Sequence, residues 1–196
     1  GGLGLLAAQW IIEGEPQYDM FAWDLARFGD WADEKFTKAK VQDQYANRFS
    51  IHFPNEERSA GRPARVRPAY EMQKDMGAVF GLNCGWEHPL WFADKAGVTD
   101  TNGFTRQNWF EPVANETKML RDHVGVIDIS NFANYRITGP GAHDWLDALL
   151  ANTIPTEVGK SCLAPLISVR GGIAGDFTVT MLGEGDYMMV GSGMAE

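Results

Sequence analysis

The C-terminal third of the chain alternates apolar and polar residues between glycine turns, and this pattern restricts the fold more than any other feature. Residues 134–138 and 177–181 alternate strictly, and residues 187–190 form a third strand-like run. Gly139-Pro140-Gly141 and Gly171-Gly172 interrupt these runs. A period of two is typical of half-buried strands, and glycine turns favour hairpins. We therefore expect antiparallel strands in this part of the chain.

Two apolar stretches predict helices. Residues 5–13 predict a mostly buried helix, which we expect to begin after Gly4 and to end at Gly14. Residues 142–150 predict an amphipathic helix. Its apolar positions are Ala142, Trp145, Leu146, Leu149 and Leu150.

The rest of the chain is less regular. Residues 30–47 predict a polar helix, and residues 114–123 predict another with Asn115 as a possible cap. Residues 54–68 hold three prolines and predict a surface connection. Residues 77–92, rich in glycine and aromatics, predict a segment lying flat on a core rather than a long element. Residues 124–130 predict a short apolar strand. Inward positions of the 30–47 helix are expected at Phe36, Val41 and Tyr45.

These elements together predict an α+β fold: a helical and loop-rich connecting segment followed by a mixed domain. With 196 residues the chain is long enough for one substantial core or two small ones. It is 44% hydrophobic, which excludes a disordered chain. The chain starts on Gly1 without a methionine, and we expect it to be a piece of a longer protein.

Charge and cysteine content exclude several classes of function. The formal net charge is −9, and the densest positive stretch is only four arginines within residues 58–67, so nucleic acid is excluded as a partner. Cys84 and Cys162 are far apart and form neither a disulfide framework nor a zinc motif, which favours a reducing compartment. No apolar run reaches the roughly 18 residues of a membrane-spanning helix.

The segment Gly2-Leu3-Gly4 directly precedes the first predicted helix. Small residues let a ligand approach the backbone, and the free N–H groups at a helix start attract a phosphate or a carbonyl oxygen. A complete dinucleotide fingerprint also needs a preceding strand, which is not present here. A merely tight entry into a helix explains the glycines equally well.

Asp176 follows Gly175 at the start of an alternating strand, where carboxylates are uncommon. The alternation places Asp176 and Thr178 on one face and Phe177 on the other. Beside a glycine, such a carboxylate can line a cavity, hold a cation or move a proton. An exposed acid at a strand edge fits the same pattern.

Other candidate side chains favour structural roles. The four histidines do not cluster, so no metal site is predicted. His123 is interpreted as a favourable helix end and His143 as a solvated side chain. Cys162 is interpreted as a small core residue. Three arginines, Arg62, Arg65 and Arg67, are interpreted as a solvated loop, with carboxylate binding as the alternative.

Three stretches in order resemble one family of enzymes. Gly1-Gly2-Leu3-Gly4, residues 10–16 and Arg27-Phe28 resemble the end of the flavin domain in dimethylglycine and sarcosine dehydrogenases. Residues 61–92 resemble the junction that follows this domain. The C-terminal part of the chain resembles the opening of the folate domain of the glycine-cleavage T-protein. The matching segments are Arg121, residues 124–130, residues 139–142, Gly171-Gly172-Ile173 and residues 176–179.

The resemblance implies three domains and two cofactors. Residues 1–16 would end an FAD oxidoreductase domain, residues 17–70 would form a connecting central domain, and residues 71–196 would begin a folate-binding aminomethyltransferase domain. In this family the flavin oxidises an N-methyl amine to an iminium, and tetrahydrofolate captures the carbon. Because most of a flavin domain would precede Gly1, we do not expect the chain to bind FAD by itself.

The same resemblance assigns the site residues. Asp176 would lie beside tetrahydrofolate as the catalytic acid, and Phe177 and Thr178 would contact the folate. Gly2, Leu3 and Gly4 would approach the flavin ring of FAD. T-proteins often carry a tyrosine where Leu163 stands and an asparagine where Ser192 stands, and these differences favour the dehydrogenase branch.

The function expected from the resemblance is oxidative demethylation of a small N-methyl amino acid. The expected partners are that small molecule and other parts of the same enzyme, without nucleic acid or membrane, in the bacterial cytoplasm or the mitochondrial matrix. A stand-alone aminomethyltransferase without flavin chemistry is one alternative, although residues 1–28 argue against it. A non-catalytic interaction module is the other.

Overall fold

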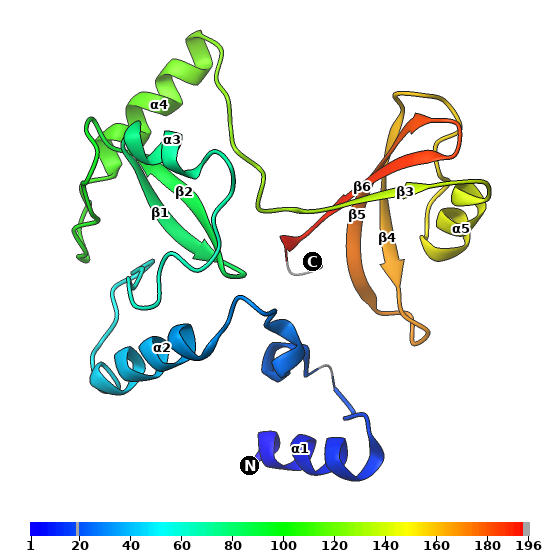
Figure 1. Ribbon diagram of the computed structural model, residues 1–196, viewed down its shortest axis with the longest axis horizontal. Coiled ribbons are helices and arrows are strands. Elements are labelled where there is room, and N and C mark those ends of the chain that lie inside the picture. The colour runs from blue at the N-terminus through cyan, green and yellow to red at the C-terminus, as the bar shows by residue number, and fades with distance from the viewer. Residues whose placement is uncertain (19, 194–196) are drawn as a thin grey trace. The chain divides into compact units, whose positions relative to one another are not determined.

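The computed structural model describes residues 1–18 and 20–193 (Figure 1). The chain divides into two compact units. The first unit comprises Gly1–Ile51 and Arg58–Arg65, and the second comprises His52–Glu57 and Val66–Glu196. Helices and antiparallel strands both occur, and the predicted α+β fold class is confirmed.

The first unit is built from helices. Asp33 begins the longest of them by accepting a hydrogen bond from the Phe36 N–H at 2.7 Å, a standard N-cap. Gly14 ends the first helix in the left-handed conformation, with φ of 79°, as its position predicts. The elements are α1 (Gly2–Glu13), the 3-10 turns η1 (Phe21–Trp23) and η2 (Leu25–Arg27), and α2 (Glu34–Ala46).

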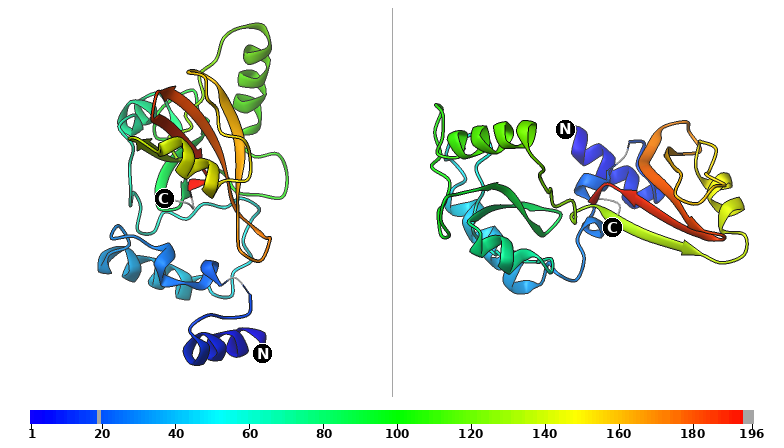
Figure 2. Two further views of the ribbon diagram at one scale, coloured as in Figure 1. Left: turned by 90° about the vertical axis from the view of Figure 1, so that its right-hand side faces the viewer. Right: turned by 90° about the horizontal axis from the view of Figure 1, so that it is seen from above.

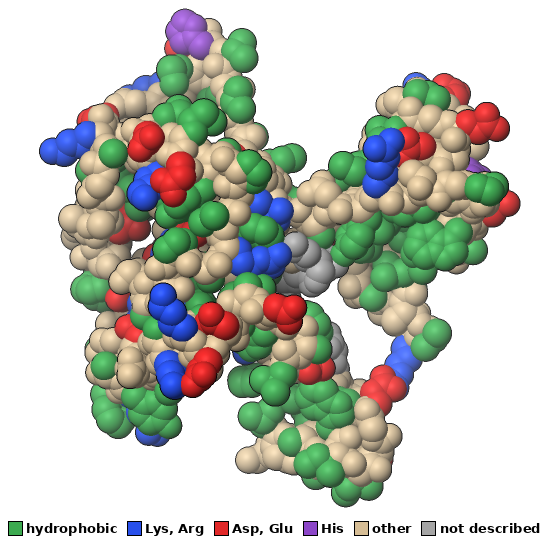
Figure 3. All heavy atoms as spheres, in the orientation of Figure 1, with side chains coloured by type: hydrophobic (Ala, Val, Ile, Leu, Met, Phe, Trp, Pro, Cys, Tyr) green, Lys and Arg blue, Asp and Glu red, His purple; other side chains and the backbone are tan. Residues whose placement is uncertain are grey.

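Helix α1 differs from its prediction in two ways. It begins at Gly2, so Gly2 and Gly4 lie within the first turn rather than ahead of the helix. None of its residues is buried, and Ile11 is 85% exposed. The helix is apolar around much of its circumference, and none of its residues belongs to a hydrophobic core of the described chain. Hydrophobic side chains consequently remain on the surface over α1 (Figure 3).

One face of α2 packs within the first unit. The Phe36 ring lies edge-on to Trp31, with ring centroids 5.1 Å apart. On the same helix, Asp43 pairs with Arg58 at 2.9 Å. Val41 and Tyr45, predicted to point inward, are exposed instead. The reason is that α2 is held through its aromatic and charged contacts, and no core layer reaches the side that carries Val41 and Tyr45.

The second unit opens with a β-hairpin between two helices. Strands β1 and β2 pair antiparallel, and Trp91 and Val79 lie in a small core with Ala93. Residues Trp109 and Val113 pack against this core. The elements are α3 (Tyr70–Asp75), β1 (Ala78–Asn83), β2 (Trp86–Phe92) and α4 (Phe110–Asp122).

This hairpin corrects the prediction for residues 77–92. Cys84 and Gly85 form a two-residue turn in which both have positive φ, 49° and 81°, the backbone that a tight hairpin requires. The register shifts between Val79 and Phe80, which breaks the alternation that identifies a strand in sequence. The predicted cap at Asn115 is also wrong, because α4 already begins at Phe110.

The C-terminal part of the second unit is a four-stranded antiparallel sheet in the order β3-β6-β5-β4. The alternation predicted for 134–138 and 177–181 is confirmed: Phe177, Val179 and Met181 are buried on one face, and Tyr135 and Ile137 pack against the same core. Glycines turn the chain where predicted, with Gly139 and Gly141 both at positive φ. The strands are β3 (Ala133–Thr138), β4 (Ser161–Ile167), β5 (Ile173–Gly183) and β6 (Asp186–Gly191).

Helix α5 (Ala142–Leu149) covers one face of this sheet (Figures 1 and 2). Leu146 is completely buried, and Ala142 and Leu150 lie beside it in a core that includes Val179 of β5. Trp145 and Leu149, which were predicted to share that core, are exposed. The helix thus has two apolar stripes, and the sheet covers only one of them.

Residues 124–130 do not form the predicted strand. Val124, Val126 and Ile127 are 94%, 99% and 83% exposed, and no described residue pairs with this segment in a β-ladder. Hydropathy alone suggested a strand, but a strand also requires a neighbouring backbone to complete its hydrogen bonds.

Candidate functional site

Asp176 lies on β5 and points to the face of the sheet opposite α5, which we call the open face. Its register partner on β4 is Pro165. Asp176 is exposed, and no described residue forms a hydrogen bond or ion pair with its carboxylate. The carboxylate is therefore available to accept hydrogen bonds from a ligand.

Thr178 joins Asp176 on the open face, whereas Phe177 does not. Phe177 is buried in the core, 7% exposed, and its ring covers Gly191 on β6. A Cβ atom placed at Gly191 would lie 2.5 Å from that ring, so the absence of a side chain there makes room for Phe177. A folate contact through Phe177 would therefore involve its backbone rather than its ring.

The open face around Asp176 is mixed in character. One row across the sheet pairs Leu163 of β4, Thr178 of β5, Val190 of β6 and Asn134 of β3. Leu163 is 62% exposed, although large aliphatic side chains are usually covered. Apolar side chains beside a free carboxylate suit a flat, partly aromatic ligand that also carries N–H donors.

A second acid on the same face is already engaged. Arg136 donates to both carboxylate oxygens of Asp186, at 3.0 and 2.7 Å. The hydrogen bonds from Arg136 hold the pKa of the Asp186 carboxyl below its ordinary value. This pair distinguishes the two acids: Asp186 is occupied by its own arginine, and Asp176 is not.

Gly2, Leu3 and Gly4 belong to the first unit. The Gly1 carbonyl accepts hydrogen bonds from the Gly4 and Leu5 N–H groups, while Gly2 and Leu3 lie too close to the helix start for an intrahelical acceptor. Nothing lies within 4 Å of a Cβ placed at Gly2 or Gly4. A ligand can approach this backbone, but the described residues there supply only a helix start, which is a small part of what FAD requires.

A polar cluster near the second unit's first helix was missed in the sequence. Asp128 accepts hydrogen bonds from Gln73 at 2.6 Å and from the Ser130 N–H at 2.8 Å. Hydrogen bonds from Ser130, opposed by burial, together with Gln73 and the charge of Arg67, hold the pKa of Asp128 below its ordinary value. Asp128 stands in the run read as an apolar strand, and this reading hid its polar role.

Arg67 corrects the interpretation of its loop as solvated. Its guanidinium lies 3.4 Å from the ring centroid of Trp86, a close cation–π contact. Its Nε atom is buried and has no described hydrogen-bond partner. The side chain is therefore a packed part of the second unit.

The other predicted side chains are placed as follows. His123 caps the C-terminal end of α4, as interpreted. Cys162 packs against the sheet core, as interpreted, and burial raises the pKa of its thiol. His143 is not simply solvated: its Nδ1 lies 3.2 Å from Asp144, and its Nε2 is buried without a described partner.

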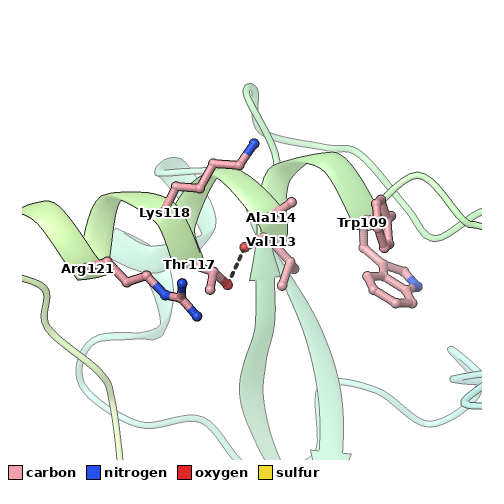
Figure 4. A pocket seen from close by; sticks show the side chains of 7 residues that line it. Trp109, Val113, Ala114, Thr117, Lys118 and Arg121 are labelled. Atoms are coloured by element: carbon pink, nitrogen blue, oxygen red, sulfur yellow. Dashed lines mark hydrogen bonds between the residues drawn. The ribbon is translucent and has the colours of Figure 1, made fainter.

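Helix α4 carries a groove of about 400 Å³ (Figure 4). Its central wall contains Val113, Ala114 and Thr117, whose hydroxyl donates to the Val113 carbonyl at 2.8 Å. The groove ends at Lys118 and Arg121. Among residues 1–18 and 20–193, no group of three or more potential metal ligands occurs, and no helix is long and apolar enough to cross a membrane.

Comparison of the chain with known protein families gives two matches. Residues 69–196 match the family model described as the GCVT N-terminal domain. The chain belongs to the GCVT N-terminal domain family. Residues 13–66 match a second model, the FAD dependent oxidoreductase central domain.

Individual proteins similar to this chain are similar along nearly its whole length, across both matched regions. The chain is 37% identical to mouse mitochondrial dimethylglycine dehydrogenase over 98% of its own length and 22% of that protein. It is 31% identical to 4-methylaminobutanoate oxidase (formaldehyde-forming) of Paenarthrobacter nicotinovorans, over 96% of the chain and 23% of the relative. The chain thus spans less than a quarter of these relatives.

A solved structure supports the fold. The glycine cleavage system aminomethyltransferase T from Bartonella henselae superposes with a TM-score of 0.52 at 27% identity. The match covers 66% of this chain and 32% of that protein. The T-protein-like fold expected for the GCVT portion is confirmed.

Proposed function

We propose that the chain is part of a flavin- and tetrahydrofolate-dependent demethylase of small N-methyl amino acids such as dimethylglycine or sarcosine. The observation that carries the proposal is the free Asp176 carboxylate on the open face, within residues that match the GCVT N-terminal domain. The names of two relatives, dimethylglycine dehydrogenase and 4-methylaminobutanoate oxidase, support N-methylated amino acids as the substrate class.

The proposed domain limits are 1–16 for the end of an FAD domain, 17–70 for a central domain and 71–196 for the start of a folate domain. The matches to residues 13–66 and 69–196 support this division. Bound FAD would oxidise the amine, and in this chain only Gly2, Leu3 and Gly4 would approach it. The described residues fit such a peripheral contact and no more.

Tetrahydrofolate would be the co-substrate of the open face. Asp176 would accept hydrogen bonds from its N–H donors and hold or move a proton at the nitrogen that takes up the one-carbon unit. Thr178 would add a hydroxyl beside the acid, and Phe177 would act through its backbone. The exposed side chain of Leu163 and the half-buried side chain of Val190 would pack against a flat ring. Proteins named as relatives are mitochondrial or bacterial, and either compartment suits the proposal.

A full-length protein containing this chain tests the proposal. Dimethylglycine or sarcosine should reduce the flavin, and with tetrahydrofolate present the released carbon should appear as methylenetetrahydrofolate. Formaldehyde alone, at equal yield with and without folate, would remove folate from the proposal. Absence of flavin reduction by any N-methyl amino acid would remove the oxidase half.

Two alternative functions can be distinguished from this proposal by experiment. A stand-alone aminomethyltransferase is favoured by the structural match to the Bartonella protein, but such a function leaves the match of residues 13–66 unexplained. A non-catalytic interaction module predicts that this chain does not bind folate even at millimolar concentration. Calorimetric titration with tetrahydrofolate, using Asp176→Ala as the matched variant, separates the module from a folate site.

A further inference from the structure

The groove on α4 is formed by two ridges of one helix. Trp109, Val113, Thr117 and Arg121 follow each other at a spacing of four, and Phe110, Ala114 and Lys118 run beside them. Rows at this spacing are the ridges between which a second helix packs. The small side chain of Ala114 lies at the middle of the groove and permits close approach. In Figure 4 the labelled side chains come from α4 and from Trp109, the residue directly before it.

A helix suits this groove better than a small molecule does. Small-molecule sites enclose most of their ligand with walls from several elements. All residues that line this groove lie between Trp109 and Arg121, so a bound small molecule would remain open on one side. A groove about 18 Å long, from 12 residue steps of roughly 1.5 Å, matches several turns of a docked helix.

The charge at one end of the groove defines the partner. Lys118 and Arg121 form no ion pair with any residue in the described ranges 1–18 and 20–193. The acids of α4, at positions 111, 116 and 122, do not line the groove. A docked helix should therefore be apolar in its middle and acidic at the end that meets Lys118 and Arg121.

The second apolar stripe of α5 has this chemistry. Trp145 is 53% exposed and Leu149 is 38% exposed, one helical turn apart. Asp144, with a side chain 91% exposed, lies next to Trp145 in the first turn of the helix. Docking this stripe leaves the α5 core contact intact, because Leu146 faces the sheet.

We propose that α4 of one copy of this chain docks α5 of a second copy, with the two helices antiparallel. In that orientation Asp144 meets Lys118 and Arg121, while Trp145 and Leu149 lie along Thr117 and Ala114, clear of Trp109 and Val113, which pack against the β1–β2 core. Antiparallel packing also places the start of α5 beside the end of α4, so the helix dipoles attract. The same contact made twice about a twofold axis gives a closed dimer.

Sedimentation velocity on the whole chain over a wide concentration range tests this dimer. The wild-type chain should pass reversibly from monomer to dimer. Lys118→Glu with Arg121→Glu should raise the dissociation constant at least about tenfold, and so should Asp144→Lys. The triple variant, with all charges exchanged, should recover dimerisation. Lys38→Glu, a surface cation paired with Glu34 in the other unit, serves as the matched control and should leave the constant unchanged.

Circular dichroism shows whether each variant is folded, and Trp145→Ala gives a second, uncharged disruption of the same contact. A chain that stays monomeric at every concentration overturns the proposal. So does a dimer whose constant is unchanged by Trp145→Ala and by both charge reversals. Crosslinks between α4 and α5 that form within one chain, at a yield independent of concentration, also overturn it.

Discussion

Asp176 and Phe177 are neighbours on β5 but serve opposite faces of the sheet: the carboxylate is exposed and the ring fills the core. The ring lies over Gly191 of β6, where a Cβ would come within 2.5 Å of it. The backbone carbonyl of Asp176 lies 3.5 Å from the same point. The packing of Phe177 therefore helps to hold the strand that presents Asp176.

Gly191→Ala should destabilise the second unit by about 1–3 kcal/mol, because the new methyl group meets the Phe177 ring in a packed core. Urea unfolding measures the change. Gly4→Ala is the control, since nothing lies within 4 Å of a Cβ there and the residue is helical. We expect that change to be neutral or to stabilise by up to about 1 kcal/mol. Equal effects of the two substitutions would contradict this packing.

Leu146→Ala should cost about 2–5 kcal/mol, because this side chain is completely buried between α5 and the sheet. Val158→Ala provides the comparison, since Val158 is 66% exposed and should change stability by no more than about 0.5 kcal/mol. Denaturant titration of both variants gives the two values. A small loss at Leu146 would mean that α5 does not pack on the sheet.

Cys84→Asn should stabilise the β1–β2 hairpin, by up to about 1 kcal/mol. Cys84 has φ of 49°, a conformation that asparagine adopts more readily than cysteine. Gly85→Ala should act in the opposite direction, because Gly85 has φ of 81°. Thermal unfolding compares the two variants with the wild type. A lower melting temperature for Cys84→Asn would argue against this turn.

Asp128 should make the second unit sensitive to acid. Its pKa is lowered in the folded chain, so its contribution to stability is fully present above the unfolded pKa of about 3.9. The contribution is lost as the pH falls through the lower folded pKa. Asp128→Asn should therefore be less stable than the wild type at pH 7, and the difference should shrink below pH 4. Unfolding titrations across this range measure it, and a difference that does not depend on pH would refute the assignment.

Much of the C-terminal sheet could be predicted, because its strands alternate and its turns carry glycine. The same alternation already placed Phe177 opposite Asp176, which limits how Phe177 can contact a ligand. The β1–β2 hairpin was missed because the register shift at Val79 and the aromatic residues of both strands obscure a period of two. Sequence periodicity describes one element at a time.

The burial of individual side chains was harder to predict, because it depends on which other elements of the chain pack against them. Residues 124–130 and α1 are as apolar as core elements, yet none of their side chains is buried in the described chain. The hydrogen bonds of Asp128 could not be predicted for a similar reason, because Gln73, which donates to Asp128, lies 55 residues away in the sequence. That Asp176 is free, while Asp186 is paired with Arg136, could be learned only from the structure.

Asp176 is the residue proposed to assist one-carbon transfer on the open face. The most direct measurement compares Asp176→Asn with Asp186→Asn in a full-length protein, following both flavin reduction by the N-methyl amine and formation of methylenetetrahydrofolate. Asp176→Asn should lower the rate of folate product formation by about 10²-fold or more, the usual contribution of a positioned acid–base group, while flavin reduction continues at the wild-type rate. Asp186→Asn should leave both rates unchanged. Methylenetetrahydrofolate formation at the wild-type rate in Asp176→Asn would show that Asp176 does not assist the transfer.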